Sequence, residues 1–186
     1  MKPHDLQKEV EILELRKTDG PFPKLDYSYV TDKHYALYAS RGMDGWKFEL
    51  SLRNLPEAVS KKFQSSLFKD HIEEPRVFSV KAEGEIIGWM ELSLEKWNNR
   101  LRIWELLVRE DFRRKGIGSK LVNRAVEVAR EKRARMIVLE TQSCNVSAIG
   151  FYLRHGFELI GFDSAAYSNQ DIGKGEVRLE FGLEVQ

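Results

Sequence analysis

Two runs of strand-type residues in the middle of the chain give the clearest pattern. Arg76–Ala82 and Ile86–Leu94 flank the short segment Glu83-Gly84-Glu85, and two such runs joined by a glycine-containing turn are typical of a β-hairpin. After Asn98-Asn99, Leu101–Val108 carries apolar residues on both faces, as expected of a buried central strand. The pattern predicts three successive antiparallel strands.

The spacing of apolar residues changes after residue 108. Ile117, Leu121, Ala125 and Val128 recur at helical spacing up to about Lys132, and Met136–Thr141 then resembles a strand again. A strand–helix–strand order requires a crossover connection, which makes the two strands parallel. The sequence therefore predicts an α/β protein with a mixed sheet.

A short helix and two closing strands are predicted after this crossover. Asn145 stands where an N-cap belongs, and the helix that follows is expected to end at Gly156. Phe157–Phe162 and Val177–Leu183 have the character of strands.

The first 75 residues are harder to interpret. Val10–Leu15 suggests a strand that stops at the turn-rich Asp19–Pro23, and alternating apolar residues at 48, 50 and 52 suggest another. Val59, Phe63 and Leu67 recur every four residues behind Pro56, a spacing that predicts a helix. The segment between Pro23 and Ser40 has no secondary-structure assignment.

Composition favours one domain over the whole range 1–186. The 186 residues contain no repeat or low-complexity linker, and a chain of this length is too short for two ordinary domains.

Thirty Lys and Arg residues against 29 Asp and Glu leave a net charge of +1, so no bulk field draws the chain to nucleic acid or anionic lipid. Its apolar runs are far shorter than a membrane helix, and the first residues lack a secretory apolar core. We expect a cytoplasmic protein.

Cysteine and histidine usage gives no indication of a metal. Cys144 is the single cysteine and four histidines are scattered along the chain, without the spacing of metal ligands. We expect no structural metal. An acyl-cysteine mechanism with Cys144 and His155 has no supporting motif.

A basic, glycine-containing loop lies between the predicted central strand and the helix. It reads Arg113-Arg114-Lys115-Gly116-Ile117-Gly118. Helix N-termini favour anions, and glycines let the backbone approach a phosphate. Residues 109–135 carry ten Lys and Arg against four Asp and Glu, a net +6 that leaves the rest of the chain at −5. A flexible loop beside a solvated helix face is the alternative, although cations at a helix start oppose the helix dipole.

The segment from Asn145 to Phe157, read together with this loop, resembles the two hallmark motifs of the GNAT N-acetyltransferases. The resemblance covers roughly residues 76–184. Within that superfamily the strings LETQ, NVSA, FYLRHGF and YSN, with KWNNR before the central strand, are similar to streptothricin acetyltransferases. The implied fold is a splayed central sheet flanked by helices, in which residues 1–75 form the acceptor side of the same domain.

The resemblance implies acetyl-CoA as the donor substrate. Its pantetheine arm would lie along the central strand near Leu107 and Val108, where a bulge would expose backbone N–H groups. Asn145 would bond the arm in addition to capping its helix. The pyrophosphate would be held by the loop and the helix start, that is by Arg113, Arg114, Lys115, Gly116, Ile117, Gly118 and Ser119.

Two residues are expected to carry the chemistry. Tyr152 matches the family's general acid, which would protonate the departing thiolate, with a core aromatic residue as the alternative. Glu105, a carboxylate among apolar residues of the central strand, is the best candidate for the base that deprotonates the amine; Glu140 or a water chain are the alternatives. The streptothricin-type enzymes tend to carry two adjacent carboxylates where this chain has Trp104-Glu105.

The predicted reaction is direct transfer of an acetyl group to a primary amine, on a small cationic molecule such as streptothricin. A protein N-terminus or lysine is an alternative acceptor, and a non-catalytic CoA-binding module is a second reading of the fold. A nucleic-acid binder, suggested only by the basic segment, lacks interleaved aromatic residues. The expected partner is a small-molecule amine, without nucleic acid or membrane, and a homodimer is left open.

Overall fold

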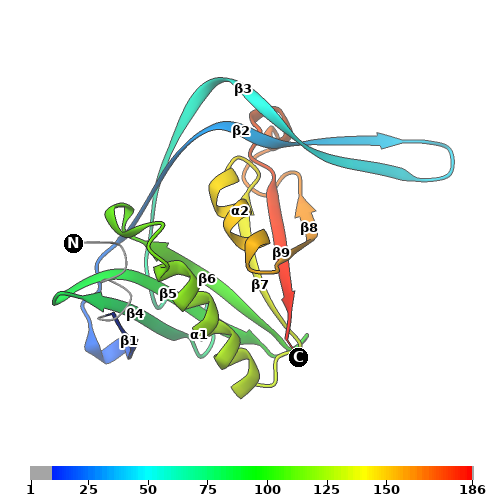
Figure 1. Ribbon diagram of the computed structural model, residues 1–186. Helices are drawn as coiled ribbons and strands as arrows, with labels where there is room; N and C mark the ends of the chain where they lie inside the picture. The colour runs from blue at the N-terminus through cyan, green and yellow to red at the C-terminus, as the bar shows by residue number, and fades with distance from the viewer. Residues whose placement is uncertain (1–9, 186) are drawn as a thin grey trace. The chain divides into compact units, whose positions relative to one another are not determined.

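The computed structural model describes residues 10–185 and has the mixed α/β architecture that the sequence predicts (Figure 1). Its backbone contacts divide the chain into two compact units. Among the described residues, the first unit comprises 10–27, 64–139 and 183–185, and the second comprises 28–63 and 140–182. The single-domain organisation stays a prediction.

The first unit is built on antiparallel strands with one long helix. Its elements are β1 (Glu11–Leu15), η1 (Lys17–Asp19), β4 (Arg76–Ala82), β5 (Glu85–Glu95), β6 (Arg100–Val108), η2 (Glu110–Phe112) and α1 (Ile117–Glu131). The strand order is β1-β4-β5-β6, and β7 (Met136–Gln142) follows β6 in parallel. The hairpin, the central strand, the helix and the crossover predicted from the sequence are all confirmed.

Helix α1 lies against β5 and β6 (Figure 1). Its buried residues recur at helical spacing, from Ile117 and Leu121 to Val128 and Ala129, because one stripe of an amphipathic helix faces the core. Gly88 of β5 makes this close packing possible: a Cβ there would lie 3.2 Å from the carbonyl oxygen of Leu107 and 3.5 Å from Ile117.

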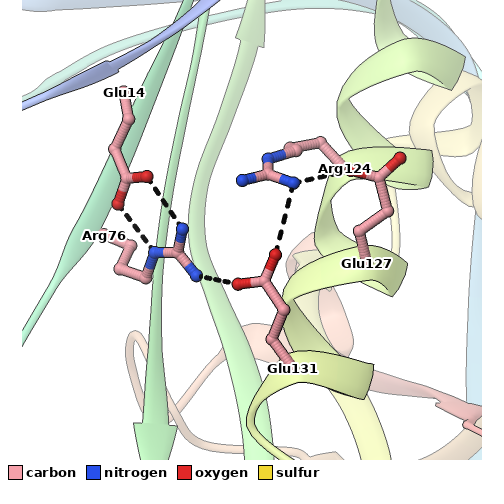
Figure 2. A network of polar contacts seen from close by, with 5 residues as sticks. All are labelled: Glu14, Arg76, Arg124, Glu127 and Glu131. Carbon is pink, nitrogen blue, oxygen red and sulfur yellow. Dashed lines mark hydrogen bonds and ion pairs between the residues drawn. The ribbon is translucent and has the colours of Figure 1, made fainter.

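An ion-pair network ties β1, β4 and α1 together (Figure 2). Arg76 of β4 binds both carboxylate oxygens of Glu14, at 2.7 and 2.8 Å, and also Glu131 at 2.6 Å. Arg124 extends the network to Glu127 and Glu131 along the helix. The network connects the helix to β1 and β4.

The second unit contains a two-stranded ribbon, the ends of the crossover and the C-terminal strands. Its elements are β2 (Leu25–Arg41), β3 (Trp46–Ser65), α2 (Val146–Arg154), β8 (Glu158–Asp163), α3 (Asp171–Lys174) and β9 (Arg178–Glu184), with β2, β3, β7 and β9 each crossing the division between units. Strand β9 lies between β7 and β8 and pairs antiparallel with β8. The closing strands and the short helix capped by Asn145 are confirmed.

The helix predicted behind Pro56 is wrong. Residues Val59 and Phe63 belong to β3, which forms a two-stranded sheet with β2. A spacing of four residues fits both the helical period and the two-residue period of a strand, so these positions also share one strand face. Proline is tolerated in β3 because each strand of a two-stranded ribbon has an unpaired edge.

Within residues 10–185, no helix has the length and apolarity needed to cross a membrane.

Candidate active site

Glu105 is buried in the middle of β6, where its side chain receives three donors. The residue is 6% exposed. Tyr27 donates its hydroxyl to Oε2 at 2.6 Å, while Oε1 accepts from Ser65 and from Lys69 Nζ, the latter at 2.7 Å. All four residues belong to the first unit. A buried carboxylate needs hydrogen-bond donors to offset the loss of water, and Glu105 has three.

A second buried carboxylate, Glu91, faces Glu105 from the neighbouring strand. The two residues are direct partners in the antiparallel register of β5 and β6. Glu91 is fully buried; its Oε1 accepts from the backbone N–H of Phe68 at 2.6 Å, and its Oε2 has no partner among the described residues. Burial raises the pKa of Glu91, and the charge of Glu105 acts in the same direction.

The bulge in β6 lies at Trp104, three residues before the position expected for it. Glu91 pairs with Glu105 while Leu92 pairs with Ile103, so Trp104 is the extra residue. Leu107 and Val108 keep the regular register against Trp89 and Gly88.

Strand β7 pairs with the start of β6, where Arg100 to Arg102 are the parallel partners of Met136 to Val138. Leu107 and Val108 lie further along β6, where the resemblance places the pantetheine arm. The splayed sheet and the role of both residues in binding the arm stay predictions.

The loop after β6 places backbone amides and cations at the start of α1. Gly116, the N-cap, has a φ of 82° and provides no side-chain cap. Arg114 also has a positive φ of 61°, and such backbone turns are typical of anion-binding loops. Because the first N–H groups of a helix lack partners within the helix, this start is chemically suited to the phosphates of acetyl-CoA.

Side chains of the loop are also tied to the end of β6. Arg113 donates from Nε to the carbonyl oxygen of Val108 at 3.1 Å, and Lys115 lies 4.8 Å from the ring centre of Phe112. Of the residues expected to bind acetyl-CoA in the first unit, Leu107 and Val108 lie in the strand that carries Glu105, and residues 113–119 come after that strand and η2. Their contact with acetyl-CoA remains a prediction.

The second unit carries the two other predicted residues on or beside α2. Asn145 caps the helix by accepting from the N–H of Ala148 at 3.4 Å, and its amide donates to Thr141 at 3.2 Å. Tyr152 is 9% exposed and packs among Phe151, Phe157 and Phe181. Burial raises the pKa of Tyr152 to about 12, which keeps the phenol protonated, as a general acid must be. The aromatic surroundings fit a core role equally well, so its catalytic role stays a prediction.

The alternative bases and nucleophiles have less suitable surroundings. Glu140 is exposed and pairs with Arg178 at 3.5 Å. Burial raises the pKa of the Cys144 thiol, the opposite of what a nucleophilic cysteine needs. His155 is bonded through Nδ1 to the carbonyl oxygen of Phe151 in its own helix, at 2.9 Å.

Sequence reasoning missed four residues that surround Glu105. Glu91 had a usable signal, because it is a carboxylate between the apolar residues Met90 and Leu92 of a strand. Tyr27, Ser65 and Lys69 had none, since they come from the part of the chain that the resemblance does not reach and lie 36 to 78 positions from Glu105.

Comparison with known proteins agrees with this geometry. Residues 46–157 match the acetyltransferase (GNAT) family, and the chain belongs to that family. No metal-binding group of three or more His, Cys, Asp or Glu side chains is found in the part of the chain that the structure describes.

Individual relatives show which GNAT proteins this chain is similar to. The streptothricin acetyltransferase of Streptomyces lavendulae is 40% identical over 89 residues, which are 48% of this chain and 47% of that protein. The chain thus spans about half the length of the curated relatives that it matches first.

Two solved structures cover almost the whole chain. A nourseothricin acetyltransferase and a Bacillus anthracis (strain Ames) protein assigned as a streptothricin acetyltransferase, the latter in complex with acetyl coenzyme A, each superpose with a TM-score of 0.76 at 27% identity. Each superposition covers 96% of this chain. It covers 100% of the nourseothricin acetyltransferase chain and 98% of the Bacillus anthracis chain.

Proposed function

We propose that this chain transfers the acetyl group of acetyl-CoA to a primary amine of a small cationic molecule, and that streptothricin is the leading candidate. The observation that carries the proposal is Glu105, a buried carboxylate on the strand that ends at the basic loop and the start of α1. The names of the relatives, and the acetyl coenzyme A held by one of them, support the donor and the acceptor.

The residues have distinct roles in this proposal. Glu105 accepts the proton that the acceptor ammonium must lose before its nitrogen can attack the thioester. The amides at the start of α1, with residues 113–119, hold the phosphates, while Leu107, Val108 and Asn145 bind the arm. Tyr152 gives a proton to the departing thiolate. Acetyl-CoA supplies the activated acetyl group, and no metal takes part.

The charge distribution favours a cationic acceptor. Residues 109–135 carry a net +6 and the remainder of the chain a net −5. A primary amine with a pKa near ~10.4 is mostly protonated at neutral pH, so an acidic surface away from the donor loop would concentrate it.

A competition assay tests the acceptor. Streptothricin, spermidine, an aminoglycoside and a short basic peptide are offered with acetyl-CoA, and kcat/KM is compared by release of the CoA thiol. We expect streptothricin to be preferred. A preference for the peptide of about tenfold, equal to ~1.4 kcal/mol in transition-state binding, would instead assign a protein substrate. If no amine is turned over, the chain is a non-catalytic CoA-binding module.

The cytoplasmic location and a homodimer belong to the same proposal. Large apolar side chains on the β2–β3 ribbon are exposed, among them Met43 and Trp46 at 101% and 66%, and an exposed apolar patch of this kind is suited to self-association. Light scattering of the wild type and of Trp46→Lys tests the dimer, for which we expect dissociation in the variant. Cell fractionation tests the location.

A further inference from the structure

Lys69 occupies the position that an acceptor amine requires. Its Nζ lies 2.7 Å from Glu105 Oε1, and a general base must be within hydrogen-bond reach of the proton that it abstracts. A lysine side chain ends in a primary ammonium on a flexible stem, the same functional group as the proposed acceptor. An incoming ammonium therefore meets a carboxylate that already holds an amine of the protein itself.

The backbone beside Lys69 is fixed by the core of the first unit. The preceding residue, Phe68, has a positive φ of 56° and donates its N–H to the buried carboxylate of Glu91. Leu67 and Phe68 pack in the same apolar cluster as Leu107 of β6. These contacts hold the Lys69 backbone beside the strand along which the acetyl donor is expected to lie.

The side chain of Lys69 is less confined than its backbone. It is 32% exposed, whereas that of Glu105 is 7% exposed. Tyr27 and Ser65 also donate to Glu105, so two of its three hydrogen bonds remain when Lys69 moves away. Because its stem is flexible and open to solvent, the amine of Lys69 can move away from Glu105 once its proton has been taken.

We propose that Lys69 is acetylated by the active site of its own chain when no external amine is present, an inference that rests on the proposed function. Glu105 takes a proton from the Lys69 ammonium. The nitrogen attacks the thioester carbonyl of acetyl-CoA, a C–N bond forms and the C–S bond breaks. The nitrogen gives up its second proton, the departing thiolate of CoA takes up one proton to become a thiol, and Lys69 becomes a neutral amide.

Two consequences distinguish this reaction from a structural salt bridge. The external acceptor and Lys69 compete for one carboxylate, so a good acceptor slows the modification of Lys69. Acetylation removes the positive charge of Lys69. The carboxylate of Glu105 is then available to bind an external ammonium.

The test uses the full chain with acetyl-CoA and no acceptor. Peptide mass spectrometry follows acetylation of each lysine over time. Lys17 is the matched control, because it also pairs with a carboxylate, Asp70 at 3.4 Å, but is 69% exposed at the surface. We expect Lys69 to be modified at least about tenfold faster than Lys17, at a rate independent of protein concentration, since intramolecular presentation raises the effective concentration of the amine.

Variants and the acceptor complete the experiment. Glu105→Gln is expected to slow Lys69 acetylation by about 10²-fold, the lower end for general base catalysis, without affecting Lys17. Streptothricin in excess is expected to protect Lys69. Lys17→Arg should leave Lys69 acetylation unchanged, and Lys69→Arg should abolish the fast modification.

The outcomes separate this inference from the proposed function. If streptothricin is acetylated while Lys69 reacts no faster than Lys17, or reacts equally fast in Glu105→Gln, the inference is overturned and the function stands. If Lys69 reacts through Glu105 but no external amine does, the proposed acceptor is wrong and the inference stands. If neither is acetylated, both are overturned.

Discussion

Glu91 of β5 and Glu105 of β6 lie directly opposite each other, and both are buried. Two carboxylates in this arrangement repel each other unless their protonation states or partners differ. Here the partners differ, because Glu105 receives three donors and Glu91 receives one, from Phe68. Burial and the neighbouring Glu105 raise the pKa of Glu91.

Glu91→Gln is expected to change how stability depends on pH. A carboxyl whose pKa is raised on folding makes the native state bind more protons, so wild-type stability falls as pH rises above the unfolded value of about 4.3. Glutamine does not titrate but still accepts from the N–H of Phe68. Urea unfolding at several pH values should therefore show the variant gaining relative to the wild type as pH increases.

Glu91→Leu serves as the matched control for that experiment. It removes the acceptor of the Phe68 N–H, and a buried donor without a partner costs about 1–3 kcal/mol. Parallel stability curves for wild type and Glu91→Gln would mean that folding leaves the pKa of Glu91 unchanged.

Glu105→Gln tests the proposed base. If Glu105 removes the acceptor proton, the variant should lose about 10²-fold in kcat/KM, and the rise of kcat/KM with pH should disappear. Glu110→Gln, an exposed carboxyl just beyond β6, should retain the wild-type profile. A preserved pH profile in Glu105→Gln would direct attention to Glu140 or to a water chain.

Tyr152→Phe distinguishes a general-acid role of Tyr152 from a role in core packing. The substitution keeps the ring among Phe151, Phe157 and Phe181 and removes only the hydroxyl. We expect kcat to fall by about 10²-fold with unchanged unfolding, measured beside Tyr38→Phe, whose side chain is exposed on β2. Full activity would assign Tyr152 to packing alone.

Gly118→Glu should abolish donor binding by placing a negative side chain in the first turn of α1. A ligand at about 100 times its Kd stabilises the folded state by about 2.7 kcal/mol, a Tm shift on the order of 5–10 °C for a chain of this size. Thermal unfolding with and without acetyl-CoA should show this shift in the wild type but not in Gly118→Glu.

Gly173→Glu is the control, because it adds the same side chain where nothing lies within 4 Å of the new Cβ. It should keep the acetyl-CoA shift. A shift that survives in Gly118→Glu would show that the phosphates bind elsewhere.

Arg76→Met should destabilise the first unit by removing the centre of the network in Figure 2. Because Glu14 and Glu131 are 44% and 48% exposed, we expect a loss of about 1 kcal/mol at neutral pH. Arg76 lowers the pKa of both carboxyls, so this stability is present above about pH 4.3 and is lost as pH falls through the lowered values. Urea unfolding should show the difference from wild type shrinking in acid. Arg76 also lies over the ring of Phe78, 5.3 Å from its centroid, and a constant difference would assign the effect to that contact.

The sequence by itself determined the elements whose signals are local. The strands from Arg76 to Val108, helix α1 and the cap at Asn145 follow from residue periodicity, turn residues and capping chemistry within a few positions. The basic loop at the start of α1 is also visible in the sequence, because cations at a helix start oppose the helix dipole. Glu105 is visible because it is a carboxylate among apolar residues of a strand.

The tertiary structure alone decided the rest. A four-residue spacing suits a helix and a strand equally, and pairing with β2 made residues 46–65 a strand. The donors to Glu105 come from Tyr27, Ser65 and Lys69, tens of residues away along the chain. No local pattern encodes such contacts, because they form only when packing and strand register bring distant segments together.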